Sequence, residues 1–167
     1  MGIFFSGREL AEVAVAIERN GAAFYDTLAK TTGDDRVRAV YDYLAGEERK
    51  HIRIFQGILD SLGEDIAGET YSGEHALYVK SLADSRVFTS DETAMEVAER
   101  ARSDAEALHL ALGIEKDSLL FYWEMKELVW GVDWGAVDRL MVEERSHIRQ
   151  LIELKGQIEE KTVGGKN

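Results

Sequence analysis

The sequence predicts an all-α protein built as a bundle of four long helices. The 167-residue chain contains no proline, so its long segments lack the residue that most strongly breaks helices. Apolar residues recur three and four positions apart over four segments, which is the spacing of a helix with one buried face. The segments form two pairs separated by about 40 residues. We therefore expect two antiparallel helical hairpins joined by a long crossover that contains short helices.

The first hairpin is expected in the N-terminal third of the chain. Its first helix begins after Ser6, whose side chain can cap the helix together with Glu9. This helix ends near Gly33, and the second helix follows as far as Gly63.

The crossover and the second hairpin occupy the rest of the chain. A glycine-rich stretch at 63–73 opens the crossover, and weaker helical patterns follow at 74–84 and 91–101. The third long helix is expected over 103–130 and the fourth over 134–161.

Composition limits the classes of function. With 45% hydrophobic and 31% charged residues, we expect one domain over 1–162 and a disordered tail at 163–167. The net charge of −12 disfavours binding to nucleic acid or to a membrane surface. Without cysteine, any metal must be held by histidine and carboxylate. The sequence has no apolar run long enough to span a membrane and no export signal, so we expect a cytoplasmic protein.

An internal repeat relates the two hairpins. A shift of 97 places Ser6, Glu18 and Phe24-Tyr25 on Ser103, Glu115 and Phe121-Tyr122. A shift of 96 places Glu47-Glu48-Arg49 and His51 on Glu143-Glu144-Arg145 and His147. The repeat predicts a pseudo-twofold bundle. Because it preserves Glu and His as well as core residues, it also indicates a site on the pseudo-twofold axis.

Four repeated glutamates lie on the apolar faces of their helices, and they are Glu18, Glu48, Glu115 and Glu144. Burying one unpaired carboxylate costs several kcal/mol, so four together must be protonated or matched by cations. No basic residue shares the inferred inner faces. Glu18 and Glu48 are each 15 residues from Gly33, so they lie level in the hairpin. Two divalent ions would neutralise the four carboxylates.

Two histidines complete the pattern. His51 follows Glu48 by three positions, and His147 follows Glu144 by three. This spacing places carboxylate and imidazole on one helical face, so both can bind one cation. The alternative is a structural bundle in which these groups form a salt-bridged core without metal. Such a bundle would keep its stability after chelation.

The pattern resembles the ferritin-like di-iron and di-manganese proteins, in which two helices each give a Glu and two others each give Glu-x-x-His. Within that superfamily four segments resemble the rubrerythrin branch: Ile17-Glu18 with Phe24-Tyr25, Glu47-Glu48-Arg49-Lys50-His51, Glu115-Lys116-Asp117 with Phe121-Tyr122, and Glu143-Glu144-Arg145-Ser146-His147. The crossover segment 78–88 is similar to that of single-domain rubrerythrin-like proteins without a rubredoxin module.

The resemblance implies a set of metal ligands and the ions that they bind. The six implied ligands are Glu18, Glu48, His51, Glu115, Glu144 and His147, with Glu48 and Glu144 as bridges. Tyr25 and Tyr122 would hydrogen-bond to the carboxylates, or they would be ordinary core aromatics. The implied cofactor is two iron ions, although manganese suits the same oxygen and imidazole ligands.

The resemblance also implies an activity and partners. The expected function is a non-haem di-iron oxidoreductase that reduces hydrogen peroxide or dioxygen in defence against oxidative stress. Rubrerythrins carry an additional Glu where this chain has Leu112, and they carry a rubredoxin module that it lacks. These differences favour a symmetric site similar to bacterioferritin-type ferroxidase centres, with electrons from Fe(II) or a separate donor protein. Iron handling without turnover is the alternative, and we expect a homodimer.

Several nearby residues are expected to lie outside the site. Glu47 and Glu143 are about 100° around the helix from the ligands, so we expect salt bridges at the core edge. His75 and His109 are expected to be surface or packing residues. Core or dimer contacts are expected for the three tryptophans, Trp123, Trp130 and Trp134.

Overall fold

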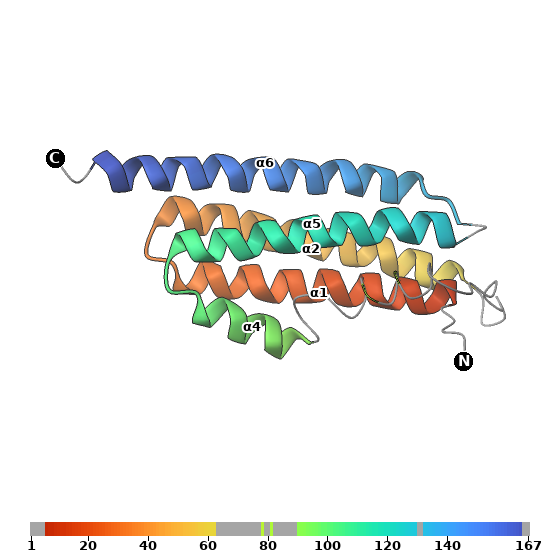
Figure 1. Ribbon diagram of the computed structural model, residues 1–167. Coiled ribbons are helices and arrows are strands. Elements are labelled where there is room, and N and C mark those ends of the chain that lie inside the picture. Colours follow the sequence, from red (N-terminus) through yellow and green to blue (C-terminus); the bar gives the residue numbers. More distant parts are fainter. Residues whose placement is uncertain (1–5, 63–77, 79–80, 82–89, 130–131, 165–167) are drawn as a thin grey trace.

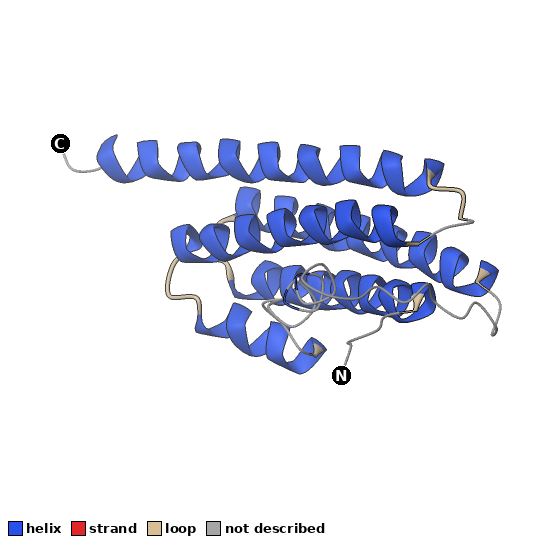
Figure 2. Ribbon diagram, turned by 45° about the vertical axis from the view of Figure 1, so that its right-hand side comes forward, coloured by secondary structure: helices blue, strands red, loops and turns tan. Residues whose placement is uncertain are grey.

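A computed structural model describes residues 6–62, 78, 81, 90–129 and 132–164. The described part of the chain forms five helices and no strand (Figures 1 and 2). The helices are α1 (Gly7–Thr31), α2 (Asp35–Ser61), α4 (Asp91–Arg100), α5 (Asp104–Leu128) and α6 (Gly135–Gly164).

The long helices form two antiparallel hairpins, one of α1 and α2 and one of α5 and α6 (Figure 1). The hairpins pack together through α1 against α5 and through α2 against α6. Helix α4 lies on the outer side of α1 and leads into α5 at the end of the bundle where α1 ends. The predicted four-helix bundle with a crossover that contains a short helix is therefore confirmed.

The ends of the elements differ slightly from the prediction. Helix α6 continues to Gly164, so it includes two residues of the tail expected at 163–167. No glycine or proline lies between Gly156 and the pair Gly164-Gly165, and glycine is the residue that favours leaving a helix. In the crossover, α4 matches the pattern at 91–101, whereas 74–84 lies outside the described residues except for Tyr78 and Ser81.

Local capping fixes where the helices begin. The Ser6 side chain accepts a hydrogen bond from the backbone N–H of Glu9 (3.1 Å), and the Glu9 carboxylate accepts one from the backbone N–H of Ser6 (2.7 Å). This is the predicted capping box. Ser103 caps α5 in the same position of the repeat, accepting from the Glu106 N–H at 3.2 Å. The two repeated helices therefore begin in the same register.

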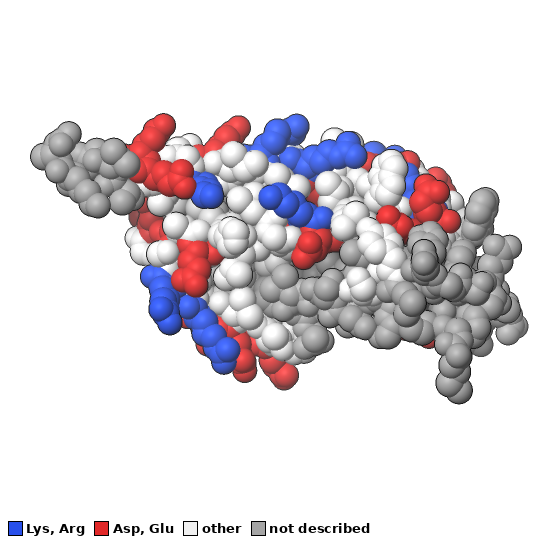
Figure 3. Space-filling view, viewed as in Figure 1, with Lys and Arg blue, Asp and Glu red and all other residues white. Residues whose placement is uncertain are grey.

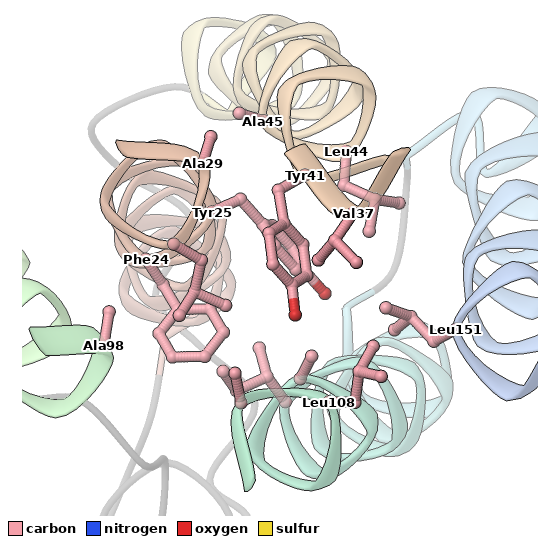
Figure 4. Close-up of a cluster of buried hydrophobic side chains, with 14 of the residues drawn as sticks. Phe24, Tyr25, Ala29, Val37, Tyr41, Leu44, Ala45, Ala98, Leu108 and Leu151 are labelled. Atoms are coloured by element: carbon pink, nitrogen blue, oxygen red, sulfur yellow. The ribbon is translucent and has the colours of Figure 1, made fainter. Parts of the chain in front are cut away.

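The core consists of two hydrophobic clusters, one at each end of the bundle. One contains Leu10, Phe55 and Tyr122. The other contains Tyr25 and Tyr41 and is shown in Figure 4, where side chains from α1, α2 and α5 meet. The predicted ligands lie between these clusters along each long helix. The two clusters thus close the middle of the bundle from both ends.

The surface carries charges of both signs. Acidic and basic side chains are interspersed on the face seen in Figure 3 and do not gather there into a basic surface. Among the described helices, none combines the length and the apolar character needed to cross a bilayer.

Candidate metal centre

The six predicted ligands lie together in the middle of the bundle. Helices α1 and α5 each contribute one glutamate, and α2 and α6 each contribute a glutamate and a histidine. None of these side chains belongs to a residue that is more than 5% exposed. The four helices therefore bring four carboxylates and two imidazoles into a site closed to solvent.

The six residues form two overlapping groups, within each of which one ligand atom per residue lies within 4.8 Å of the others. The groups are Glu18, Glu48, His51 and Glu144, and Glu48, Glu115, Glu144 and His147. Glu48 and Glu144 belong to both groups, which is the arrangement that the bridging prediction requires. Each group could hold one metal ion.

The unsatisfied atoms of the first group point to an ion. Glu18 Oε2, His51 Nδ1 and Glu144 Oε1 are buried without a hydrogen-bond partner. Nevertheless, His51 Nδ1 is 3.3 Å from Glu18 Oε2 and 3.0 Å from Glu144 Oε1. These atoms converge without hydrogen-bond geometry, although buried polar atoms are nearly always paired. A cation shared among them would satisfy all three, so the donor set fits a metal.

In the second group the histidine also lies between two glutamates, and one of these contacts has hydrogen-bond geometry. His147 Nδ1 is 3.2 Å from Glu144 Oε2 and 3.6 Å from Glu115 Oε2. The rings of His51 and His147 are stacked, with centroids 5.6 Å apart and planes inclined by 24°. Both imidazoles direct Nδ1 toward Glu144, which belongs to both groups.

Two tyrosines connect the hairpins beside these groups. The Tyr25 hydroxyl of α1 donates a hydrogen bond to Glu115 Oε1 of α5. The Tyr122 hydroxyl of α5 donates to Glu18 Oε1 of α1. The predicted hydrogen bonds to the carboxylates are thus present, and both rings also belong to the hydrophobic clusters. A role for these hydroxyls at a bound metal stays a prediction.

Burial dominates the titration of the carboxyls. It raises the pKa of Glu18 and of Glu48 well above the ordinary value, and it raises the pKa of Glu115 to about 8. Burial also acts to raise the pKa of Glu144, but its interactions with the neighbouring His147 and His51 outweigh burial and lower that pKa. Without metal, the cluster therefore keeps protons on some carboxyls and a negative charge on Glu144.

The histidines and tyrosines titrate in keeping with these charges. Burial acts to lower the pKa of the imidazoles, but the neighbouring carboxylates raise it to about 9 for His51 and about 10 for His147. Burial raises the pKa of Tyr25 and Tyr122 well above the ordinary value, so both remain hydrogen-bond donors. No lysine or arginine is among the buried residues that the structure describes. A metal-free core network here would consist of glutamate, histidine and tyrosine alone.

Gly21 is a site residue that the sequence analysis missed. A Cβ at this position would lie 3.0 Å from Glu48 Oε2. Its counterpart in the repeat is Ser118. The missing side chain thus leaves the space that the Glu48 carboxylate occupies. The available signal was a glycine one turn after Glu18 on the buried face of a helix, where alanine is preferred.

The two glutamates expected at the core edge behave differently. Glu47 forms the expected salt bridge, with Oε1 2.5 Å from Lys50 Nζ. Glu143 instead reaches across to α2, where its Oε2 lies 3.2 Å from His51 Nε2. As predicted from its position around α6, Glu143 belongs to neither metal-binding group. That position could not predict the contact with His51, because His51 lies on a different helix.

Those of the other predicted bystanders that the structure describes lie outside the two metal-binding groups. His109 is exposed on α5, as expected. Trp134 packs against one hydrophobic cluster, and its Nε1 donates to the Val129 carbonyl at 3.2 Å. Trp123 is 53% exposed. His75 and Trp130 lie outside the described residues.

Comparison with known families agrees with this geometry. The model of the rubrerythrin family matches residues 9–155. The chain belongs to the rubrerythrin family. The match spans both hairpins and includes all six predicted ligands, so the family resemblance seen in the motifs is confirmed. For this rubrerythrin-family protein, the assignment of individual residues as ligands stays a prediction supported by the clustering.

A solved structure supports the fold. A candidate ferritin-like diiron-carboxylate protein from Thermotoga maritima superposes with a TM-score of 0.71. The two sequences are 24% identical, and the similarity covers 93% of this chain and 97% of that chain. The ferritin-like fold is therefore confirmed. No curated protein matches the sequence significantly.

Proposed function

We propose that this rubrerythrin-family protein is a non-haem di-iron oxidoreductase that reduces hydrogen peroxide or dioxygen in oxidative-stress defence. Its electrons would come from Fe(II) or from a separate donor protein. The observation that carries the proposal is the pair of buried four-residue groups that share Glu48 and Glu144. Family membership supports iron as the metal.

The six clustered side chains would hold the two ions. Four carboxylates balance the charge of two divalent cations, so binding would replace the protons that the metal-free cluster retains. Oxygen and imidazole donors suit iron and also manganese. Metal analysis is therefore the first test of the cofactor.

The protein supplies the environment for the chemistry. Two Fe(II) ions bound here would provide the two electrons that, with two protons, convert one hydrogen peroxide to two waters. Tyr25 and Tyr122 hold Glu115 and Glu18 in place through their hydroxyl groups. The hydrophobic clusters on both sides exclude bulk water, which strengthens the electrostatic interactions inside the site.

Iron content and peroxide consumption test the proposal. After Fe(II) loading and removal of loosely bound ions, we expect about two irons per chain by elemental analysis, one for each four-residue group. Glu115→Ala should lose iron and activity because it removes a carboxylate from one group. Glu127→Ala, at an exposed position of the same helix, is the matched control and should retain both. Full iron content and activity in Glu115→Ala would contradict the ligand set.

Iron handling without turnover is the second candidate. It is favoured by Leu112, which is buried in a hydrophobic cluster where rubrerythrins carry an additional Glu. Turnover separates the two functions. Repeated peroxide consumption with added reductant while the irons stay bound supports the enzyme. A single oxidation followed by iron release supports handling.

A homodimer is the proposed assembly. Leu120 and Trp123 lie one turn apart on α5 and are 41% and 53% exposed, and exposed apolar pairs of this kind favour association. We expect the mass of a dimer by light scattering and a monomer for Trp123→Glu. Lys116→Glu, an exposed change on the same helix, is the control. A monomeric unaltered protein would contradict the proposal.

A further inference from the structure

The two halves of the metal centre differ in what the outer nitrogen, Nε2, of each histidine contacts. On one side, His51 directs Nδ1 toward Glu18 and Glu144, and its Nε2 lies 3.2 Å from Glu143 Oε2. Glu143 comes from α6, so this contact crosses between the hairpins. His51 is 0% exposed, whereas the Glu143 side chain is 50% exposed. A surface carboxylate therefore reaches the outer nitrogen of a buried imidazole.

The repeat predicts the same contact on the other side, but it is absent there. The counterpart of Glu143 is Glu47, and the counterpart of His51 is His147. Glu47 is instead held by Lys50 at 2.5 Å. Within the described part of the chain, the ion pairs of His147 all use Nδ1. The outer contact of His147 is with the ring of Tyr43, which stands perpendicular to it at 6.3 Å.

The sequence explains why the repeat is broken at this point. Lys50 has Ser146 as its counterpart, and Tyr43 has Arg139. Glu143 thus has no lysine one turn further along its own helix to draw it away, and its ion pair among the described residues is with His51. The asymmetry thus arises at two of the positions where the repeated segments differ in sequence.

A carboxylate on the outer nitrogen changes how a histidine binds metal. It accepts the Nε2–H hydrogen bond, which fixes the tautomer with Nδ1 free, orients the ring and increases the basicity of Nδ1. Loss of such a partner typically weakens metal binding by about 10- to 100-fold. Only the His51 side of the described site has this support.

We propose that Glu143 is a positioning residue for His51, and that the ion pair with Lys50 keeps Glu47 from contacting His147 in the same way. As a result, the two metal positions bind ions with unequal affinity. The position that contains His51 is the tighter one. This inference rests on the metal centre of the proposed function but not on its redox activity.

Co(II) titration of the full-length, metal-free protein tests the inference without any activity measurement. Calorimetry should resolve two binding steps of unequal affinity, and the visible absorption of Co(II) reports its ligands in each step. Glu143→Ala should weaken the tighter step by about 10- to 100-fold and leave the weaker step nearly unchanged. In Glu143→Gln the affinity of the tighter step should lie between those of the unaltered protein and of Glu143→Ala, because an amide oxygen still accepts the Nε2–H bond but carries no charge.

Matched variants on the other side serve as controls. Glu47→Ala should leave both steps unchanged, because Lys50 already holds that carboxylate away from His147. Lys50→Ser installs the residue found at the equivalent position 146, frees Glu47 and should strengthen the weaker step. Thermal unfolding of each metal-free variant confirms that it is folded.

The outcomes distinguish the inference from the function on which it rests. Equal effects of Glu143→Ala and Glu47→Ala, or an unchanged tighter step in Glu143→Ala, would overturn the role of Glu143. An unchanged weaker step in Lys50→Ser would overturn the role of Lys50. If the unaltered protein bound no Co(II), the metal centre itself would be overturned.

Discussion

Tyr122 and Tyr41 are buried tyrosines with opposite hydrogen-bonding states. The Tyr122 hydroxyl donates to Glu18, whereas the Tyr41 hydroxyl has no partner among the described residues. Tyr122→Phe leaves a buried carboxyl oxygen unsatisfied, so we expect a loss of about 1–3 kcal/mol in the unfolding free energy of the metal-free protein. Tyr41→Phe removes an unpaired hydroxyl and should be neutral or stabilising. Urea unfolding measures both, and equal losses would contradict the bond to Glu18.

Gly21 and Gly113 offer a matched test of space at the centre. Alanine in place of glycine inside a helix normally stabilises by about 1 kcal/mol. Gly113→Ala should show this gain, since a Cβ there meets nothing within 4 Å. Gly21→Ala should displace Glu48, whose Oε2 would lie 3.0 Å from the new Cβ. We expect Co(II) affinity to fall about tenfold in this variant only, as typical for a displaced ligand support. Equal Co(II) affinities of Gly21→Ala and the unaltered protein would contradict a need for this space beside Glu48.

At the scale of the helix, Ser6 determines where α1 begins. Its capping box satisfies backbone groups that the helix itself leaves unpaired. Ser6→Ala should lower the unfolding free energy by about 1 kcal/mol, whereas Ser6→Gly should cost only a few tenths. Chemical denaturation provides the comparison. An unchanged unfolding free energy in Ser6→Ala would contradict a stabilising role for the Ser6 side chain.

Helix positions could be predicted because their signals are local. Ser6 and Ser103 mark the starts of two helices in the sequence, and their side chains cap those helices in the structure. The end of α6 was placed three residues early, because its last turn lacks the apolar spacing that indicates a packed helix face. In the structure the helix nevertheless continues to Gly164.

For the whole molecule, burial of the site makes the metal-free protein sensitive to pH. A group with a higher pKa in the folded than in the unfolded chain stabilises the fold at low pH and loses this effect as pH rises through its folded pKa. The stabilising contribution of Glu115 is lost between about pH 4.5 and pH 8, its folded pKa. The contributions of His51 and His147 are lost between about pH 6.5 and their folded pKa values of about 9 and 10. Glu144, whose pKa is lowered, acts oppositely at acidic pH. We therefore expect stability to decrease from mildly acidic to alkaline pH.

Metal binding should reverse this trend. Bound ions require deprotonated ligands, so their stabilising effect increases with pH. We expect the difference in Tm between Mn(II)-loaded and metal-free protein to widen from pH 5 to pH 9, and chelation to lower Tm substantially at neutral pH. Calorimetric scans at several pH values measure this difference. A difference independent of pH would contradict neutralisation of the carboxylates by metal.

The sequence alone determined the helices, their pairing and the six clustered residues. Helical spacing placed each Glu and His on a buried face, and the repeat related the two halves, because both properties depend on positions within one chain segment. Tyr25 and Tyr122 were also found through the repeat. Family membership followed from the same motifs.

Only the tertiary structure decided how the segments meet. It showed that Glu143 touches His51 across the hairpins and that Gly21 makes room for Glu48. It also showed that Lys50 holds Glu47. Contacts between helices depend on their separation and relative rotation, which spacing within one helix does not specify. A repeat in sequence thus predicted a symmetric site, whereas side-chain packing between helices made its two halves different.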